Sequence, residues 1–210
     1  MSRDEFTKNY WRFYILLENK FISTLNYVEL VEENFSTYSV EYAHQLLSIG
    51  SELDSFLKIY CDFNPQKRKT MKLYVDYLVD NYSDINLQKI YIPTADIELI
   101  PYEKIRKFDP KKEKNPLDWW NAYNKVKHNR QGNLTQASLE NVINALSALY
   151  LIEMKYLQII TEGTEETDEP DPKSEIFQLK NWEFHTPLIP TEIDKYFANK
   201  EKEWTATLNH

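Results

Sequence analysis

The chain has 210 residues, of which 42% are hydrophobic and 14% aromatic, and its formal net charge is −8. This composition supplies enough apolar material for a folded core, and the length fits one domain with an appendage better than two domains. The three glycines exclude a glycine-rich phosphate loop, and the single Cys61 excludes an internal disulfide and a cysteine-based metal cage.

The sequence also favours a cytoplasmic protein. A single cysteine fits a reducing compartment, and the amino-terminal residues lack the uninterrupted apolar stretch of a secretory signal. The most apolar region, residues 142–160, is interrupted by polar side chains that would be costly to place in lipid. We therefore expect a core helix there and no membrane partner.

Helical periodicity dominates the first eighty residues. Apolar residues recur at steps of three and four from Arg3 to Val31, which predicts one long helix. A second helix is expected after Ser36 or Ser39, either of which can cap it, and it should end before Pro65. A shorter third helix is predicted over residues 69–81.

The pattern then changes to short β-branched runs punctuated by prolines. Residues 90–92 and 98–100 predict a small hairpin, and residues 110–116 predict a basic surface loop. A helix should follow from about 117 to 127, and a longer apolar helix should run to about 160, with Thr135 available as its cap.

The last fifty residues differ from the rest of the chain in composition and pattern. Residues 162–175 hold seven acids against one lysine, a composition typical of a mobile linker. Two later runs, 176–179 and 182–184, are possible strands that could pair with the hairpin.

Together these elements predict a mainly α protein. Residues 1–161 should form an antiparallel bundle of four to five helices with an insertion at about 85–115, residues 162–174 an acidic linker, and residues 175–210 an irregular or β-containing tail that packs on the bundle or the insertion.

One segment, residues 119–130, combines aromatic, amide, cationic and imidazole side chains. On a helix Asn124 and His128 are four residues apart and Lys127 lies within the same turn, so the three could converge. An imidazole can take a proton from a ribose hydroxyl, while an amide and a cation orient and stabilise phosphate. That combination is the chemistry of metal-free RNA cleavage, and it requires no cofactor.

Simpler interpretations of the same residues remain open. The two tryptophans can be core or interface anchors, and His128 can be a helix-end cap. The remaining histidines lack metal-ligand spacing, so no metal site is predicted.

The long helices, with a polar motif leading into the last apolar helix, resemble the HEPN superfamily. Its motif is an Arg, usually followed by a polar residue such as Asn, then three variable positions and a His. Here Asn124 and His128 match, and Tyr123 stands where the superfamily places its Arg. Lys127 and Arg130 are the cations available nearby to replace it. The resemblance covers about residues 1–160.

The resemblance implies a homodimer that binds RNA and acts as a metal-independent endoribonuclease in a bacterial defence or toxin-type system. It gives catalytic roles to His128, Asn124 and Lys127. Binding roles then go to Arg130, Tyr123, Lys125 and Trp120. The competing hypothesis is a catalytically inactive helical module that binds another protein. A small-molecule enzyme has little support beyond the capacity of helical bundles to house pockets.

Overall fold

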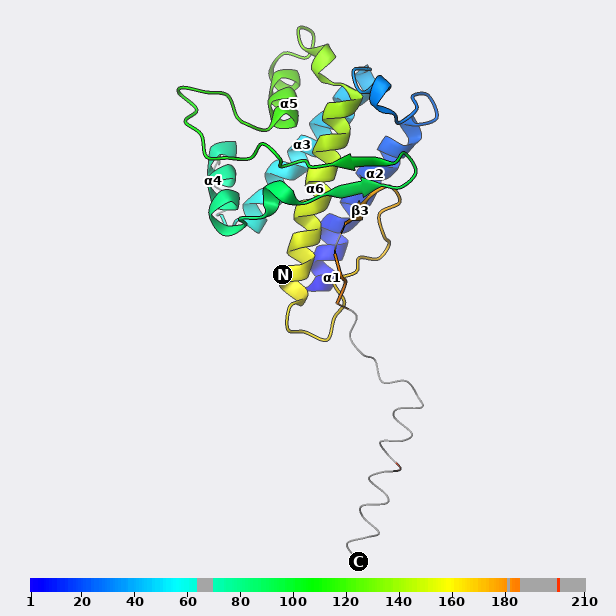
Figure 1. Ribbon diagram of the computed structural model, residues 1–210, viewed down its shortest axis with the longest axis vertical. Coiled ribbons are helices and arrows are strands. Elements are labelled where there is room, and N and C mark those ends of the chain that lie inside the picture. Colours follow the sequence, from blue (N-terminus) through cyan, green and yellow to red (C-terminus); the bar gives the residue numbers. More distant parts are fainter. Residues whose placement is uncertain (64–69, 181, 186–199, 201–210) are drawn as a thin grey trace, which may run out of the picture.

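The computed structural model describes residues 1–63, 70–180, 182–185 and 200. The helical elements within these ranges are α1 (Arg3–Phe6), η1 (Thr7–Trp11), α2 (Arg12–Thr24), η2 (Glu32–Asn34), α3 (Val40–Tyr60), α4 (Met71–Asn81), η3 (Ile85–Leu87), α5 (Asp118–His128), η4 (Leu134–Gln136) and α6 (Leu139–Thr161). The strands are β1 (Ile90–Ile92), β2 (Ile97–Leu99) and β3 (Gln178–Leu179). The predicted mainly α fold with a small hairpin is confirmed (Figure 1).

The amino-terminal helix is continuous through α1, η1 and α2, and Ser2 and Glu5 form a capping box at its start. Its middle part, η1, is a wider π-helical turn. The helix ends at Thr24, seven residues before the predicted end. The Thr24 hydroxyl donates to the Phe21 carbonyl, the Leu25 amide donates to the Ile22 carbonyl, and the amides of Tyr27 and Val28 both donate to the Thr24 carbonyl, which closes the helix.

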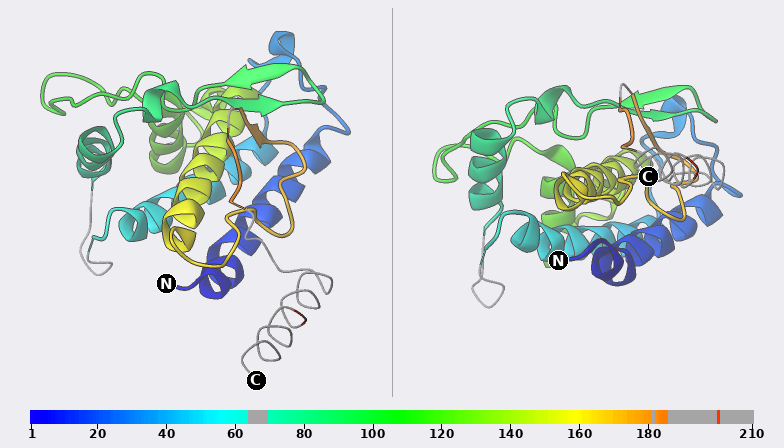
Figure 2. Two further views of the ribbon diagram at one scale, coloured as in Figure 1. Left: turned by 60° about the horizontal axis from the view of Figure 1, so that its bottom comes forward. Right: turned by 90° about the horizontal axis from the view of Figure 1, so that it is seen from below.

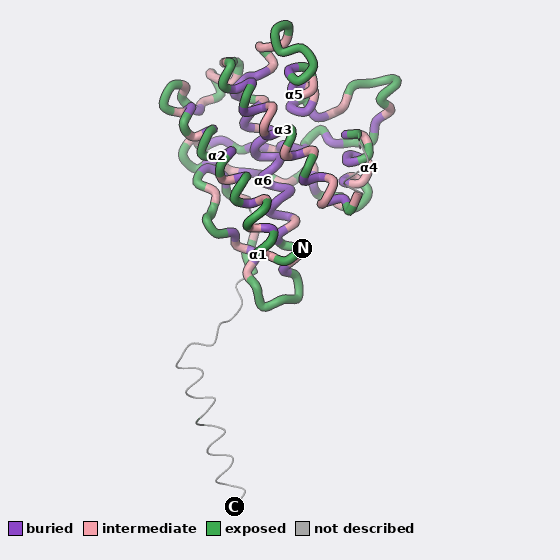
Figure 3. Tube along the Cα trace, turned by 180° about the vertical axis from the view of Figure 1, so that it is seen from behind, coloured by how far each residue is buried: buried purple, intermediate pink, exposed green. Residues whose placement is uncertain are grey.

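The long helix α6 is the centre of the fold. In Figure 2 it lies between the sheet on one side and the amino-terminal helix with α3 on the other. Buried residues gather along it in Figure 3, as the predicted core helix requires. Its N-cap is Ser138, whose hydroxyl accepts from the Asn141 amide, and the predicted cap Thr135 instead lies in η4. Among the described residues, no helix is long and apolar enough to span a bilayer.

The sheet has the order β2-β1-β3, and all pairs are antiparallel. β1 and β2 form the predicted hairpin, with Ile90 opposite Leu99. β3 comes from the tail and pairs with β1, where Ile90 lies opposite Leu179. The predicted pairing of the tail with the insertion is therefore confirmed for the first tail run. The second run, residues 182–184, forms no strand.

The acidic segment 162–174 makes tertiary contacts that a mobile linker would not make. The Arg3 guanidinium donates to the carbonyls of Thr167 and Glu169, each at 2.9 Å. The indole nitrogen of Trp11 donates to the Pro172 carbonyl at 2.7 Å. The acids of this segment mostly face solvent while its backbone bonds to the amino-terminal helix, which is why its composition misled the prediction. Apart from residue 200, the tail beyond 185 lies outside the described residues.

A candidate anion-binding cleft

The predicted cluster lies on α5, whose aromatic side chains hold it to the bundle. Trp119, Trp120 and Tyr123 are 4%, 6% and 3% exposed. The Trp119 indole nitrogen donates to the Pro101 carbonyl at 2.8 Å, and the rings of Trp120 and Tyr123 lie 4.9 Å apart. The tryptophans are therefore packing anchors, as the simpler interpretation held, and only a small part of Trp120 is open to a ligand.

Gly50 of α3 sets how closely α5 approaches. A Cβ atom at this position would lie 2.3 Å from Cδ2 of Tyr123, well inside contact distance. The Tyr123 ring therefore rests directly on the α3 backbone. The absence of a side chain at Gly50 thus permits a close approach of the two helices, and this approach orients the face of α5 that carries Asn124 and Lys127.

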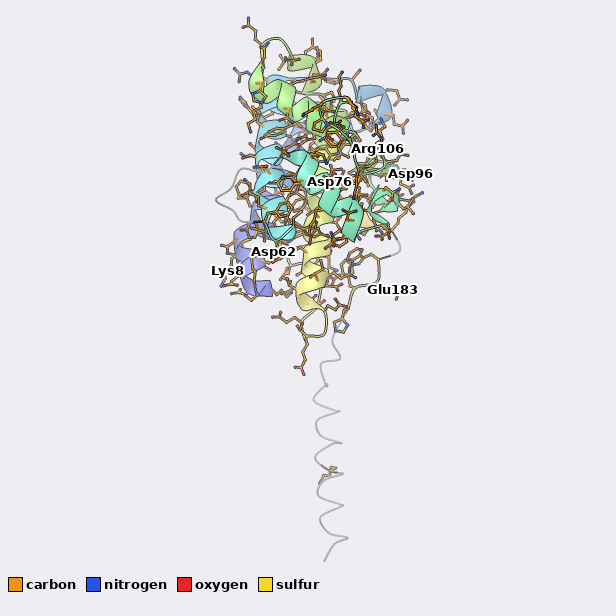
Figure 4. The ribbon with its side chains drawn as sticks, turned by 90° about the vertical axis from the view of Figure 1, so that its left-hand side faces the viewer. Lys8, Asp62, Asp76, Asp96, Arg106 and Glu183 are labelled. Atoms are coloured by element: carbon orange, nitrogen blue, oxygen red, sulfur yellow. The ribbon has the colours of Figure 1, made fainter. Side chains whose placement is uncertain are left out.

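That face borders a cleft of about 570 Å³ between α3, α4, the loop around residues 108–115 and α5. Figure 4 faces this side of the molecule and labels Asp76 and Arg106, which pair with two of the lining residues, Lys72 and Glu113. The charged lining residues are Lys58, Lys72, Lys114, Lys127, Asp54 and Glu113. Lysines outnumber acids by two, although the whole chain is negative.

Two of the lysines are held by partners on their own helices. Lys58 lies 2.8 Å from Asp54, and Lys72 forms an ion pair with Asp76. The two acids of the lining are also engaged. Asp54 is the partner of Lys58, and Glu113 pairs with Arg106 at 2.6 Å. This pairing lowers the pKa of Glu113 below its usual value and raises that of Arg106. These contacts fix the lysine side chains and leave N–H donors available to an anion.

Lys127 is oriented by Tyr123 one turn earlier. Its ammonium nitrogen lies 3.0 Å from the Tyr123 hydroxyl oxygen and 5.1 Å from the centre of the ring. Asn124 lines the cleft beside it, and its amide nitrogen donates to the Trp120 carbonyl at 3.1 Å. The Asn124 side-chain oxygen therefore remains available as an acceptor. Trp120, Tyr123, Asn124 and Lys127 are thus four predicted site residues that share one cleft.

The other predicted residues lie elsewhere. His128 is the exposed last residue of α5 and is not among the lining residues of the cleft. Lys125 is turned to the Gln136 side-chain oxygen at 3.0 Å, and Arg130 is exposed in the turn after the helix. The structure therefore brings Asn124 and Lys127 together but leaves the imidazole outside.

Lys58 and Lys72 were missed by sequence reasoning. Their only signal was an acid four residues away on the same helix, Asp54 before Lys58 and Asp76 after Lys72. Such pairs are usually solvated helix surface. Their approach to α5 is a property of the tertiary structure.

Two other hollows have the opposite charge. One of about 150 Å³ near the start of α5 is lined by three acids, Glu103, Asp118 and Glu140, against one cation, Lys104. Another of about 840 Å³ near the end of α6 carries Glu162, Asp168 and Glu183, with no lysine or arginine among its described lining residues. The cleft beside α5 is therefore the better candidate for an anion.

The described residues offer no group of three or more His, Cys, Asp or Glu side chains that could hold a metal ion. Cys61 is buried, and burial raises the pKa of its thiol to about 12, which disfavours a nucleophilic thiolate. No family model, curated protein or solved structure matches the chain.

Proposed function

We propose that the protein binds RNA, with phosphate groups of the strand held in the cleft beside α5. The observation that carries the proposal is the convergence of four lysines from α3, α4, α5 and the loop 108–115. Lys114 and Lys127 can neutralise phosphates and release their counterions, whereas Lys58 and Lys72, which also hold Asp54 and Asp76, can add N–H donors. The Asn124 side-chain oxygen adds an acceptor that can bond a ribose hydroxyl or a base edge.

The charge distribution supports a local rather than a general interaction. A net charge of −8 repels a polyanion from most of the surface, so affinity has to come from a confined positive region. The buried rings of Trp120 and Tyr123 leave little area for base stacking, and phosphate contacts are then the main source of binding energy.

Fluorescence anisotropy with a labelled single-stranded RNA tests the proposal. The doubly substituted variant Lys114→Ala/Lys127→Ala should bind at least about tenfold more weakly at low salt, and the slope of log affinity against log salt should become shallower by about 1.4. The variant Lys8→Ala/Lys20→Ala removes the same charge from the exposed surface of the amino-terminal helix and is the matched control.

Equal losses in the two variants would show a nonspecific charge effect and contradict the proposal. A DNA strand of the same sequence serves as a second arm, since equal affinity for it would reduce the function to general anion binding. The HEPN resemblance adds a homodimer and a role in bacterial defence to the proposal, and sedimentation velocity of the full chain tests the dimer.

A further inference from the structure

Glu153, in the middle of α6, is sealed inside the protein without a hydrogen-bonding partner. It is 0% exposed, and neither of its carboxyl oxygens has a hydrogen-bonding partner among the described residues. A charged carboxylate in such a place would cost several kcal/mol, because neither water nor a donor compensates the lost hydration. Burial, with a smaller contribution from Glu52, raises the pKa of Glu153 well above its usual value.

A second buried acid in the same protein shows that burial alone does not deprive a carboxyl group of hydrogen-bonding partners. Glu18 of α2 is also 0% exposed. Its carboxylate accepts from the Tyr14 hydroxyl at 2.7 Å, from the Ser174 hydroxyl and from the Glu175 amide at 2.9 Å. Glu153 lacks any comparable set of donors. The two residues therefore form a natural pair of a partnered and an unpartnered buried carboxyl group.

The groups that act electrostatically on Glu153 do not relieve it. Glu52 on α3 is a half-buried acid whose pKa is itself raised by burial. Tyr10 on η1 has a pKa raised by burial and by the charges of Glu52 and Glu153. Lys155, two positions along α6, is directed to Asp84 at 3.8 Å and to the Trp182 ring. An ionised Glu153 would therefore meet a second acid and a phenol, and the one cation named here, Lys155, is directed to Asp84 instead.

The start of the amino-terminal helix is the shortest of the elements around Glu153, and it carries Tyr10, whose pKa responds to the charge of Glu153. An aromatic cluster packs α1 and η1 against α6 and α3. In it, the ring of Phe6 lies 5.8 Å from that of Tyr156, and the ring of Tyr10 lies 5.1 Å from that of Phe56. Lys8 and Asn9 are exposed, and η1 is a π-helical turn. The facing helices α3 and α6 are much longer than η1 and pack on each other, so η1 is the shortest element whose displacement would admit water to Glu153.

We propose that Glu153 is a proton-dependent latch: its neutral carboxyl group allows α1 and η1 to pack on α3 and α6, and its ionisation releases them. The proton leaves to bulk solvent, and no other reactant is required. The sign of the effect follows from linkage. The pKa of Glu153 is higher in the folded than in the unfolded protein. The contribution of Glu153 to stability is therefore fully present below its unfolded pKa and falls as pH rises, until Glu153 itself ionises in the folded state.

Hydrogen exchange of the full chain at pH 6 and pH 9, expressed as protection factors, tests the latch. In the wild type, protection of the α1 and η1 amides should fall by about tenfold or more over this range, since each pH unit between the two pKa values changes the equilibrium by up to about tenfold. Glu153→Gln, which cannot ionise, should show the same protection at both pH values. Glu52→Gln should make the loss smaller, because removing the like charge lowers the raised pKa of Glu153 and narrows the gap between its folded and unfolded values.

Glu18→Gln is the matched control and should retain the wild-type dependence on pH, because Glu153 is intact. If Glu153→Gln folds poorly, Glu153→Met supplies an uncharged side chain of similar size for the same measurement. A wild-type dependence on pH that persists in the uncharged variants would overturn the proposal, as would α1 and η1 amides whose protection is the same at both pH values in the wild type.

Discussion

The ammonium nitrogen of Lys127 and the hydroxyl oxygen of Tyr123 lie 3.0 Å apart on one face of α5. In the HEPN resemblance suggested by the sequence, Tyr123 stands where the motif has an arginine; here its hydroxyl group accepts a hydrogen bond from Lys127, one helical turn later. The pair thus fixes a positive charge at the wall of the cleft without an arginine. Tyr123 is a positioning residue for Lys127 in the proposed binding of RNA.

Tyr123→Phe should weaken RNA binding by about fivefold, because the net contribution of one such hydrogen bond is about 1 kcal/mol. The ring stays in place, so the free energy of unfolding should change by less than about 1 kcal/mol. Anisotropy and urea denaturation measure the two quantities. Tyr27→Phe, at a residue that is 88% exposed, is the control and should leave both unchanged. Unaltered RNA affinity in Tyr123→Phe would remove the positioning role.

Gly50→Ala should destabilise the protein although alanine favours a helix by about 1 kcal/mol over glycine. The added Cβ would lie 2.3 Å from the Tyr123 ring, and forcing α5 away should cost about 1–3 kcal/mol or more. Urea denaturation measures the difference. Ser51→Ala, at the neighbouring exposed position of α3, should change stability by less than about 0.5 kcal/mol. A Gly50→Ala protein more stable than wild type would show that the two helices are not in close contact.

His128→Ala should leave RNA affinity within about twofold of wild type, because His128 does not line the cleft. A general base must come within hydrogen-bond reach of the hydroxyl it deprotonates. We therefore expect RNA incubated with wild-type protein and EDTA to remain intact on a denaturing gel. Cleavage by the wild type that is lost in His128→Ala would instead support the catalytic role that the motif suggested.

Glu18→Ala should release the segment after residue 173 from the bundle. The substitution leaves the Tyr14 hydroxyl, the Ser174 hydroxyl and the Glu175 amide without their acceptor, at about 1–3 kcal/mol for each donor that remains buried. Faster proteolysis near Ser174 and faster exchange of the β3 amides should accompany the lower stability. Glu29→Ala, at an exposed residue, is the control. If β3 stays protected in Glu18→Ala, the segment is anchored by other contacts.

The sequence by itself determined the secondary structure and its class. The spacing of apolar residues fixed α3, α4, α5 and α6 to within a few residues, because a helix that buries one face repeats every 3.6 residues. The β-branched runs between prolines likewise located the hairpin, and the aromatic, amide and cationic side chains of α5 pointed to the element that borders the cleft.

Only the tertiary structure decided how these elements meet. It joined Lys58 and Lys72 to the face of Asn124 and Lys127, left His128 outside, and packed the acidic segment on the amino-terminal helix. It also enclosed Glu153 without a donor while surrounding Glu18 with three. Local patterns record which face of an element is apolar. Which polar groups come together depends on contacts between residues distant in sequence, and a single chain read locally does not contain that pairing.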